Sequence, residues 1–273
     1  MGLWYEETYA DRVRLALKVR RTLHAEDSVF QHIEIVETEA MGRVLVLDGV
    51  FMTSERDEHY YHEMLVHPAL TTVERPARVL IIGGGDGGTA REVLRHPEVE
   101  RVDMVEIDGR VVEACKAYLP GFGAWYDPRL HVEIGDGVAY VRDANEPRYD
   151  VVLLDGTDPV GPGKGLFDEA FYRNVYRMLA PGGAFALQSE SPFLMREVFT
   201  EIQDTLGRIF GKVDPYFGPA PIYGAGVWSW TLASDAVDPL APAAVRVQRI
   251  EAVAKYYNAA IHRAAFARPN ELR

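Results

Sequence analysis

The sequence predicts an α/β protein: a Rossmann-like parallel sheet forms the core, and a small antiparallel β domain precedes it. Two observations support this prediction. From residue 78 onward, short apolar strands alternate with segments of helical spacing, a pattern typical of βαβ units. The part before residue 70 consists of strand-like stretches and a single helical one. We therefore expect an N-terminal β-strand domain over 1–70 and a nucleoside-binding catalytic domain over 71–273.

The sequence pattern places the individual elements as follows. The expected strands cover 30–38, 42–54 (with a turn at Asp48-Gly49), 78–82, 101–108, 130–136, 149–156, 182–190 and 226–234. The expected helices cover 55–70, 89–96, 109–119, 137–144, 168–179 and 246–264. Because proline cannot continue a helix, the first helix is expected to end near Pro68.

Composition and charge exclude several classes of protein. The 273 residues include 41 acidic and 29 basic side chains, a net charge of −12, which argues against nucleic-acid binding and is compatible with a small cationic substrate. No apolar run approaches the roughly 18 residues of a membrane span, and the N-terminus lacks the pattern of a signal peptide. The single cysteine, Cys115, excludes an intrachain disulfide. We expect a cytoplasmic protein without membrane contact.

The stretch "RVLIIGGGDGGTAREVLRH" at 78–96 indicates a ligand site. Gly83, Gly85 and Gly88 satisfy the spacing of a dinucleotide fingerprint, so NAD binding is one interpretation. Asp86, however, lies in the middle of the turn and would repel a pyrophosphate at the helix N-terminus. A sulfonium nucleoside carries no phosphate and is positively charged. The turn therefore favours a cationic nucleoside as the ligand.

Acidic residues also follow the other predicted strands at the same edge of the sheet. Glu106 lies twenty positions beyond Asp86, where a carboxylate accepts hydrogen bonds from ribose hydroxyls. Asp136 is placed to accept from the exocyclic amine of adenine. Asp155 and Asp158 lie three residues apart after the fourth strand of the core. Such a carboxylate cluster suits either amines or a metal ion, and the sulfonium-type pocket favours amines.

Several motifs together resemble the spermidine synthases, which are polyamine aminopropyltransferases. These motifs occur in the order of that family and over nearly the whole chain: "GRVLVLDGV", "ERDEHYYHEML", "VLIIGGGDGGTAREVLRH", "MVEID", "DGTDPVGP", "LFDEAFY", "PGG" and "YYNAAIHRAAFARPNEL". Methyltransferases share the Rossmann-like, methyltransferase-type core but not this set of motifs. The resemblance implies transfer of the aminopropyl group from decarboxylated S-adenosylmethionine to putrescine, which gives spermidine and methylthioadenosine.

The resemblance also implies roles for particular residues. Asp155 matches the general base, and Asp86 matches the residue that holds the aminopropyl amine. The positions that match contacts to the polyamine or line its cleft are Tyr61, His62, Asp158, Tyr223 and Trp228. The positions around the nucleoside are Gln31, Gly83, Gly85, Glu106, Asp136, Gly137 and Pro162. By the same resemblance we expect a homodimer or a dimer of dimers, assembled partly through the N-terminal strands.

The mechanism that these roles imply requires no metal or other cofactor, because the sulfonium of the co-substrate is already a good leaving group. Asp86 would attract the ammonium of the decarboxylated donor and oppose the carboxylate of ordinary S-adenosylmethionine. Met52 stands where many members of the family have glutamine, which leaves the acceptor open: cadaverine, agmatine or a longer polyamine could take the place of putrescine. Two competing functions are an S-adenosylmethionine-dependent methyltransferase, which the charge of Asp86 disfavours, and a non-enzymatic polyamine-binding module.

Overall fold

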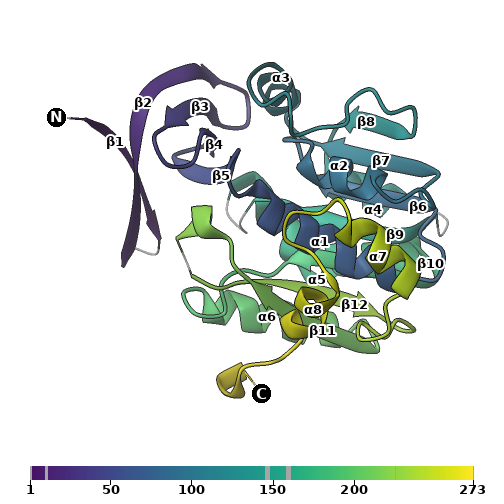
Figure 1. Cartoon of the computed structure of the whole chain (residues 1–273). Helices are drawn as coiled ribbons and strands as arrows, with labels where there is room; N and C mark the ends of the chain where they lie inside the picture. Colours follow the sequence, from purple (N-terminus) through teal and green to yellow (C-terminus); the bar gives the residue numbers. More distant parts are fainter. Residues whose placement is uncertain (1, 10–11, 145–147, 158–160, 225, 273) are drawn as a thin grey trace.

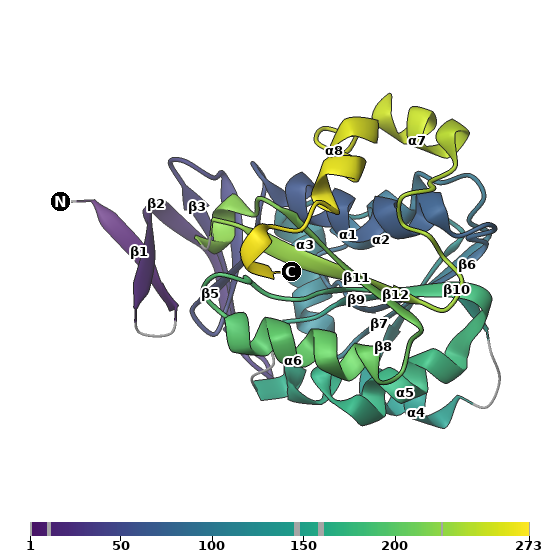
Figure 2. The same ribbon diagram turned by 90° about the horizontal axis from the view of Figure 1, so that it is seen from below.

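The computed structural model describes residues 2–9, 12–144, 148–157, 161–224 and 226–272. Within them the chain forms a small antiparallel sheet and a larger, mostly parallel sheet covered by helices on both faces (Figures 1 and 2). The predicted fold class is therefore confirmed. In the described part of the chain, no helix is both long enough and apolar enough to span a bilayer.

The small sheet has five antiparallel strands in sequence order. They are β1 (Leu3–Tyr9), β2 (Val13–Asp27), β3 (His32–Thr38), β4 (Arg43–Leu47) and β5 (Val50–Ser54). Asp48 and Gly49 form the tight turn between β4 and β5, both with positive φ (49° and 86°), as a two-residue hairpin loop requires. One face of the sheet packs against helix α3 (Gly109–Tyr118). The sequence pattern does not predict β1 and β2, because their apolar residues are partly exposed and do not form a buried run.

The large sheet has the strand order β11-β12-β10-β9-β6-β7-β8. Its strands are β6 (Arg78–Gly83), β7 (Arg101–Glu106), β8 (Leu130–Ile134), β9 (Tyr149–Asp155), β10 (Leu179–Gln188), β11 (Lys212–Gly218) and β12 (Trp228–Ser234). β8, β7, β6, β9 and β10 pair in parallel, and β12 and β11 add to the β10 edge in antiparallel fashion. The order reverses between β6 and β9, and in open α/β sheets ligands bind at such a reversal.

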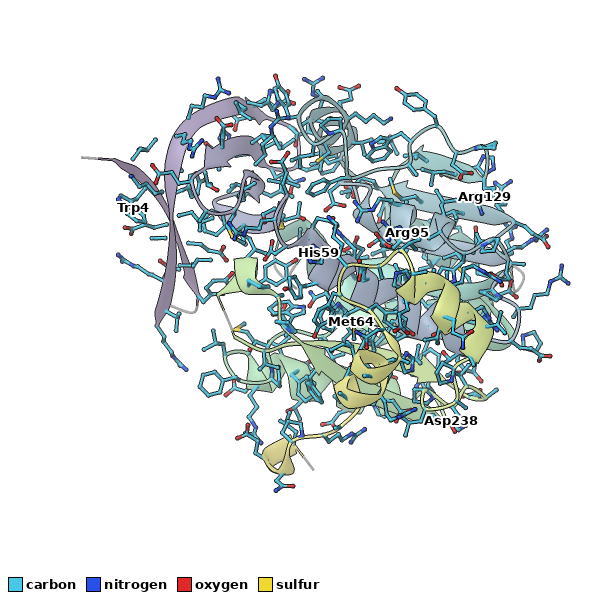
Figure 3. All side chains as sticks on the ribbon, in the orientation of Figure 1. Trp4, His59, Met64, Arg95, Arg129 and Asp238 are labelled. Atoms are coloured by element: carbon cyan, nitrogen blue, oxygen red, sulfur yellow. The ribbon has the colours of Figure 1, made fainter. Side chains whose placement is uncertain are left out.

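Helices cover both faces of the large sheet (Figure 2). One face carries α1 (Glu58–Thr72), α2 (Gly88–Leu94), α7 (Ala244–Glu251) and α8 (Ala259–Ala265), and the other carries α4 (Gly137–Asp143), α5 (Glu169–Met178) and α6 (Arg196–Gly207). Met64 of α1 belongs to the buried core on the first of these faces, and Trp4, labelled with it in Figure 3, lies at the outer end of the small sheet. Short 3-10 helices span Gly161–Phe167, Pro221–Tyr223 and Asn270–Leu272.

The expectation that α1 ends near Pro68 is wrong, because the helix continues to Thr72. A proline inside a helix removes the hydrogen bond to the carbonyl four residues earlier, here that of Met64. The hydroxyl of Tyr216 on β11 donates to that carbonyl at 2.9 Å. The hydroxyls of Thr71 and Thr72 in turn donate to the carbonyls of His67 and Pro68 at 2.7 and 2.6 Å. These contacts satisfy the backbone around the proline.

The single helix expected over 246–264 is also wrong, because the segment forms α7 and α8 with a break between them. In the break, the backbone amides of residues 255–257 turn toward the buried carboxylate of Glu63, at 2.7–2.8 Å. Asn258 then caps the N-terminus of α8 by accepting from two backbone amides. A tertiary hydrogen-bond acceptor on α1 therefore overrides the local helical pattern.

We predict that Tyr216→Phe lowers the free energy of unfolding by about 1–3 kcal/mol, the cost of a buried carbonyl left without a donor. Tyr216 is fully buried, and its ring stacks on Trp230, so phenylalanine preserves the packing. The matched control is Tyr176→Phe, which removes a hydroxyl contact to Asp235 at the surface and should change stability by no more than about 0.5 kcal/mol. Urea unfolding of the three proteins measures both effects. Equal losses in the two variants would contradict this explanation of the continuous α1.

Candidate active site

A cavity lies at the carboxyl ends of β6, β7 and β9, where the strand order reverses. It collects predicted site residues from distant parts of the chain: Gln31, Tyr61, His62, Gly83, Gly85, Asp86, Glu106, Asp136, Gly137, Asp155 and Tyr223. Asp158 lies outside the described residues, as does the side chain of Pro162. The chain topology thus brings these separate motifs to one place.

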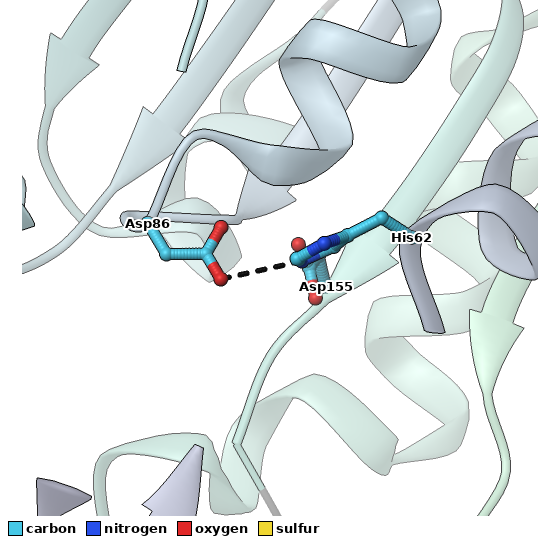
Figure 4. A group of neighbouring side chains, drawn as sticks. All are labelled: His62, Asp86 and Asp155. Atoms are coloured by element: carbon cyan, nitrogen blue, oxygen red, sulfur yellow. Dashed lines mark ion pairs between the residues drawn. The ribbon is translucent and has the colours of Figure 1, made fainter. Parts of the chain in front are cut away.

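His62, Asp86 and Asp155 form the centre of the cavity (Figure 4). His62 Nε2 lies 3.2 Å from Asp86 Oδ2, and Asp86 Oδ1 accepts the backbone N–H of Gly88 at 2.7 Å. Asp155 Oδ2 accepts the hydroxyl of Thr89 at 2.7 Å. One nitrogen or oxygen atom from each of the three central side chains lies within 4.8 Å of the others. Such a group can hold either an ammonium or a metal ion.

Two glycines make this close approach possible. A Cβ on Gly88 would lie 2.3 Å from the His62 ring, so the imidazole can reach Asp86 only because the side chain is absent. Gly83 has φ of 82°, and a Cβ there would lie 2.1 Å from the carbonyl oxygen of Asp155. Glycine at these positions therefore lets α1 and β9 approach the turn that carries Asp86.

The central groups influence one another electrostatically. Burial opposes a charged imidazole, but the carboxylates of Asp86 and Glu58 outweigh it and raise the pKa of His62 well above its ordinary value. Burial raises the pKa of Asp155, an effect that the charge of His62 opposes and that of Asp86 supports. A carboxylate with a raised pKa is a better proton acceptor for an amine than an ordinary one. The site combines an imidazolium with two carboxylates of different environment.

The side of the cavity toward β7 contains the residues predicted around a nucleoside. Glu106 is 8% exposed and accepts the backbone N–H of Asp108 at 2.9 Å. Burial, with a smaller contribution from the charges of Asp108 and Asp155, raises the pKa of Glu106 to about 7. Asp136 caps α4 by accepting from the amides of residues 138 and 139, and it also lines the cavity. Gln31 reaches the same region and donates to Asp108 at 3.0 Å.

A smaller cavity adjoins the first one on the side of the N-terminal sheet. Both cavities share Met52, Tyr61, Gly156, Thr157 and Tyr223 in their linings. The smaller one adds Glu7, Gln188 and Trp228. The Tyr223 ring contacts those of Tyr61 and Trp228, with centroids 5.8 and 4.5 Å apart. The two cavities are therefore adjacent, with Asp155 in the lining of the first, the buried Glu7 of β1 in the lining of the second, and aromatic side chains shared between them.

Sequence reasoning missed several residues that complete this arrangement: Glu7, Glu58, Thr89, Arg91 and Gln188. Glu58 had a signal, because it precedes His62 by four residues on a predicted helix. Glu7 and Gln188 had none, because their place at the site depends on the pairing of β1 with β2 and of β10 with β12.

The Rossmann-type sheet and the acidic cavity at its strand ends fit a nucleoside-binding enzyme, and comparison with known proteins gives its family. Residues 58–241 match the family of the spermine/spermidine synthase domain, and residues 3–55 match the spermidine synthase tetramerisation domain. The polyamine aminopropyltransferase of Desulforudis audaxviator is 43% identical over 100% of this chain and 98% of its own length. That of Bacillus subtilis is 42% identical over 98% and 96%.

Solved structures give the same answer. A spermidine synthase in complex with the transition-state analogue AdoDATO superposes with a TM-score of 0.95 at 40% identity, covering 98% of this chain and 93% of its own. The spermidine synthase of Thermotoga maritima gives 0.94 at 39% identity, with 99% and 93% covered. The chain therefore belongs to the spermine/spermidine synthase family. The prediction of a polyamine aminopropyltransferase is confirmed.

We predict that Glu106 makes the folded state less stable as pH rises. Its pKa is about 7 in the folded protein, against an ordinary value of 4.5, so the folded state binds the extra proton between these values. The free energy of unfolding should fall across that window, by up to about 3 kcal/mol from this group. Glu106→Gln should remove this part of the pH dependence. Urea unfolding at about pH 5 and about pH 8 measures it, and the exposed Glu133→Gln, as control, should follow the unsubstituted protein. An unchanged slope in Glu106→Gln would contradict the prediction.

Proposed function

We propose that this enzyme transfers the aminopropyl group of decarboxylated S-adenosylmethionine to putrescine, giving spermidine and methylthioadenosine. One observation carries the proposal: Asp86, Glu106 and Asp155 converge on a cavity whose described lining includes His62 but no lysine or arginine. A cavity of this charge favours cationic ligands, and both proposed substrates are cations. The related spermidine synthase described as a complex with AdoDATO supports the donor class.

The donor would lie along the strand ends from β7 to β6. Glu106 and Asp136 both line this part of the cavity. In the proposal, Glu106 accepts from the ribose hydroxyls and Asp136 accepts from the adenine amine. Gly83, Gly85 and Gly137 line the cavity beside these carboxylates. Asp86 would then receive the ammonium at the end of the aminopropyl group. This assignment gives the carboxylate in the glycine turn a ligand of opposite charge.

The reaction is a displacement at the carbon next to sulfur. The neutral nitrogen of the acceptor forms a bond to that carbon while the carbon–sulfur bond breaks. The electron pair of the broken bond goes to sulfur, which gives uncharged methylthioadenosine. Alkyl amines are protonated near neutral pH, so one proton must leave the attacking nitrogen. In the proposal, Asp155 orients this amine and accepts the proton. Tyr61, 8% exposed and beside Asp155, would shape the cleft around the reacting carbon.

The acceptor would extend from Asp155 into the smaller cavity. Aromatic rings of Tyr61, Tyr223 and Trp228 suit the methylene chain of a diamine, and Glu7 offers a carboxylate for its distal ammonium. Glu7 is 4% exposed, and its Oε2 accepts the backbone N–H of Phe51 at 2.8 Å, which holds it in place. We propose putrescine as the preferred acceptor. Assays with cadaverine, agmatine and longer polyamines test this choice, because a longer acceptor would require Glu7 to move.

Catalysis in this proposal involves no metal and no further cofactor, since the sulfonium leaves without assistance. The group His62, Asp86 and Asp155 also has a spacing that would suit a metal ion. Against that use, Asp86 and Glu58 both contact the imidazole, which favours a protonated ring that offers no lone pair to a metal. Assays run in chelator test this point directly, and a loss of activity that a divalent ion restores would contradict it.

We also propose that the enzyme is a homodimer or a dimer of dimers, with the N-terminal β domain, placed at 1–70, in the interface. The match of residues 3–55 to a tetramerisation domain supports this assembly. β1 is an edge strand that projects from the body of the molecule (Figure 1), and it leaves Leu3 and Trp4 63% and 55% exposed. Exposed edge strands with apolar side chains pair readily with another chain. Pairing there would also fix Glu7 at the acceptor site.

We predict that Asp155→Asn lowers turnover by roughly 10²–10⁴-fold, the usual contribution of a general base. Donor affinity should change little, because the amide keeps the size of the side chain and its contact with Thr89. Steady-state kinetics with putrescine and the decarboxylated donor, in the presence of chelator, provide the measurement. The exposed Asp143→Asn is a control for the substitution itself. An unchanged turnover number in Asp155→Asn would remove this residue from the chemistry.

We predict that Asp86→Asn reduces discrimination between the decarboxylated donor and ordinary S-adenosylmethionine. Loss of a charge-assisted hydrogen bond should weaken the decarboxylated donor by roughly tenfold to a hundredfold. Its parent compound should lose less or gain, because a repulsion between carboxylates is relieved. Calorimetric titration of both nucleosides into both proteins gives the four affinities. If both ligands weaken equally, Asp86 only shapes the glycine turn, and a methyltransferase-like donor site becomes the better interpretation.

A further inference from the structure

A row of side chains of alternating charge runs from Asp86 between α1 and α2. Its first three members, Asp86, His62 and Glu58, line the cavity, and the last, the partly buried Arg91, does not. His62 Nε2 contacts Asp86 at 3.2 Å, and its Nδ1 contacts Glu58 Oε2 at 2.7 Å. The same oxygen of Glu58 accepts from Arg91 Nη2 at 2.6 Å. Asp86, His62, Glu58 and Arg91 therefore alternate in sign and are joined by three short contacts.

The outer pair of this row is well shielded from water. The side chain of Glu58 is 5% exposed and that of Arg91 is 17% exposed. Burial opposes the ionised form of Glu58, but His62 and Arg91 outweigh it and lower the pKa of Glu58 to about 2. Arg91 is held in turn by Glu92 at 2.8 Å and by the carbonyl of Phe122 at 3.0 Å. Glu58 is thus a fixed negative charge behind the imidazole.

The contacts of the His62 ring make its interaction with Asp86 dependent on the charge of Glu58. The ring packs directly on the backbone of Gly88, so its plane is set by that contact, and each of its two nitrogens faces one carboxylate. Asp86 has only two described contacts, the amide of Gly88 and His62. If Glu58 lost its charge, the imidazolium would shift its interaction toward Asp86, and less of the Asp86 charge would be available to a ligand.

We propose that Glu58 and Arg91 are positioning residues for the aminopropyl end of the donor, acting through His62 on Asp86. Neither residue has to touch the substrate: Arg91 fixes Glu58, Glu58 balances the imidazolium, and Asp86 thereby keeps its orientation and charge for the donor ammonium. This inference rests on the proposed contact between Asp86 and the donor. It extends the set of residues proposed to determine donor affinity from the glycine turn to Glu58 of α1 and to Arg91 on the side of α2 that contacts it.

The test is calorimetric titration of Glu58→Gln with two nucleosides, the decarboxylated donor and methylthioadenosine. Methylthioadenosine has the same nucleoside but no aminopropyl ammonium. We expect the donor to weaken by roughly tenfold to a hundredfold, the effect of a lost charged hydrogen bond, while methylthioadenosine binds as before. The double variant with Asp86→Asn should bind the donor no more weakly than Asp86→Asn alone, because both substitutions interrupt one path. Equal weakening of both nucleosides, or additive losses in the double variant, would overturn the inference.

Two further variants make the outcome decisive. Arg91→Lys keeps the positive charge but loses the guanidinium group that contacts both Glu58 and Glu92. It should weaken the donor less than Glu58→Gln does, without weakening methylthioadenosine, and it provides a test even if Glu58→Gln fails to fold. Arg95→Gln removes a neighbouring ion pair with Glu92, at 3.2 Å, and should leave both affinities unchanged. If Asp86→Asn itself leaves donor affinity intact, the proposed donor contact fails. If Asp86→Asn weakens donor binding but Glu58→Gln and Arg91→Lys do not, the proposed donor contact stands and only the positioning role of Glu58 and Arg91 fails.

Discussion

The structure depends on one electrostatic constraint: several carboxylates must stay close together in a cavity that is largely shielded from water. Asp86 and Glu106 are 9% and 8% exposed, and Asp155 lines the same cavity at the end of β9, the strand that pairs with β6. A buried charge without a partner destabilises the folded protein, and each of these carboxylates is stabilised in a different way. Asp86 contacts the imidazole of His62. Asp155 accepts a hydrogen bond from a hydroxyl and has a raised pKa. Glu106 accepts hydrogen bonds from backbone amides and has a pKa of about 7. A cationic ligand would neutralise the remaining negative charge of these carboxylates, so ligand binding would also balance the buried charge.

Helix α1 connects this constraint to the rest of the fold. Its first turns carry Glu58, Tyr61 and His62 into the site. Glu63, on the same helix, holds the segment that separates α7 from α8, and the carbonyl of Met64 receives the hydroxyl of Tyr216. Burying polar groups on every side of one helix requires a partner for each of them. The large sheet, the C-terminal helices and the glycine turn all supply such partners, and α1 is therefore held in a single orientation.

The sequence predicted the features that follow from local patterns of residues, and it missed the helix ends that depend on side chains distant in the chain. The alternation of strands and helices, the hairpin at Asp48-Gly49 and the convergence of acidic residues at strand ends follow from short-range patterns, and they appear in the structure. The continuation of α1 beyond Pro68 and the break before α8 depend on Tyr216 and Glu63, which no local pattern connects to those segments. In the sequence, Arg91 is one more polar residue of an ordinary helix. Its role is visible only when α2 is packed against α1.

The arrangement of charges also explains why one histidine does not cancel the attraction for a cationic donor. His62 is shared between Asp86, which contacts one ring nitrogen, and Glu58, which contacts the other, and Glu58 is itself paired with Arg91. In formal charges, the row from Arg91 to Asp86 sums to zero, so it does not offset the negative charge that Asp155 and Glu106 carry when they are ionised. If Glu58 were neutral, the row would be positive by one and would offset that charge. On the proposed contact between Asp86 and the donor ammonium, selectivity for a donor that carries an ammonium in place of a carboxylate would depend on Glu58, on the other side of the imidazole, as well as on Asp86.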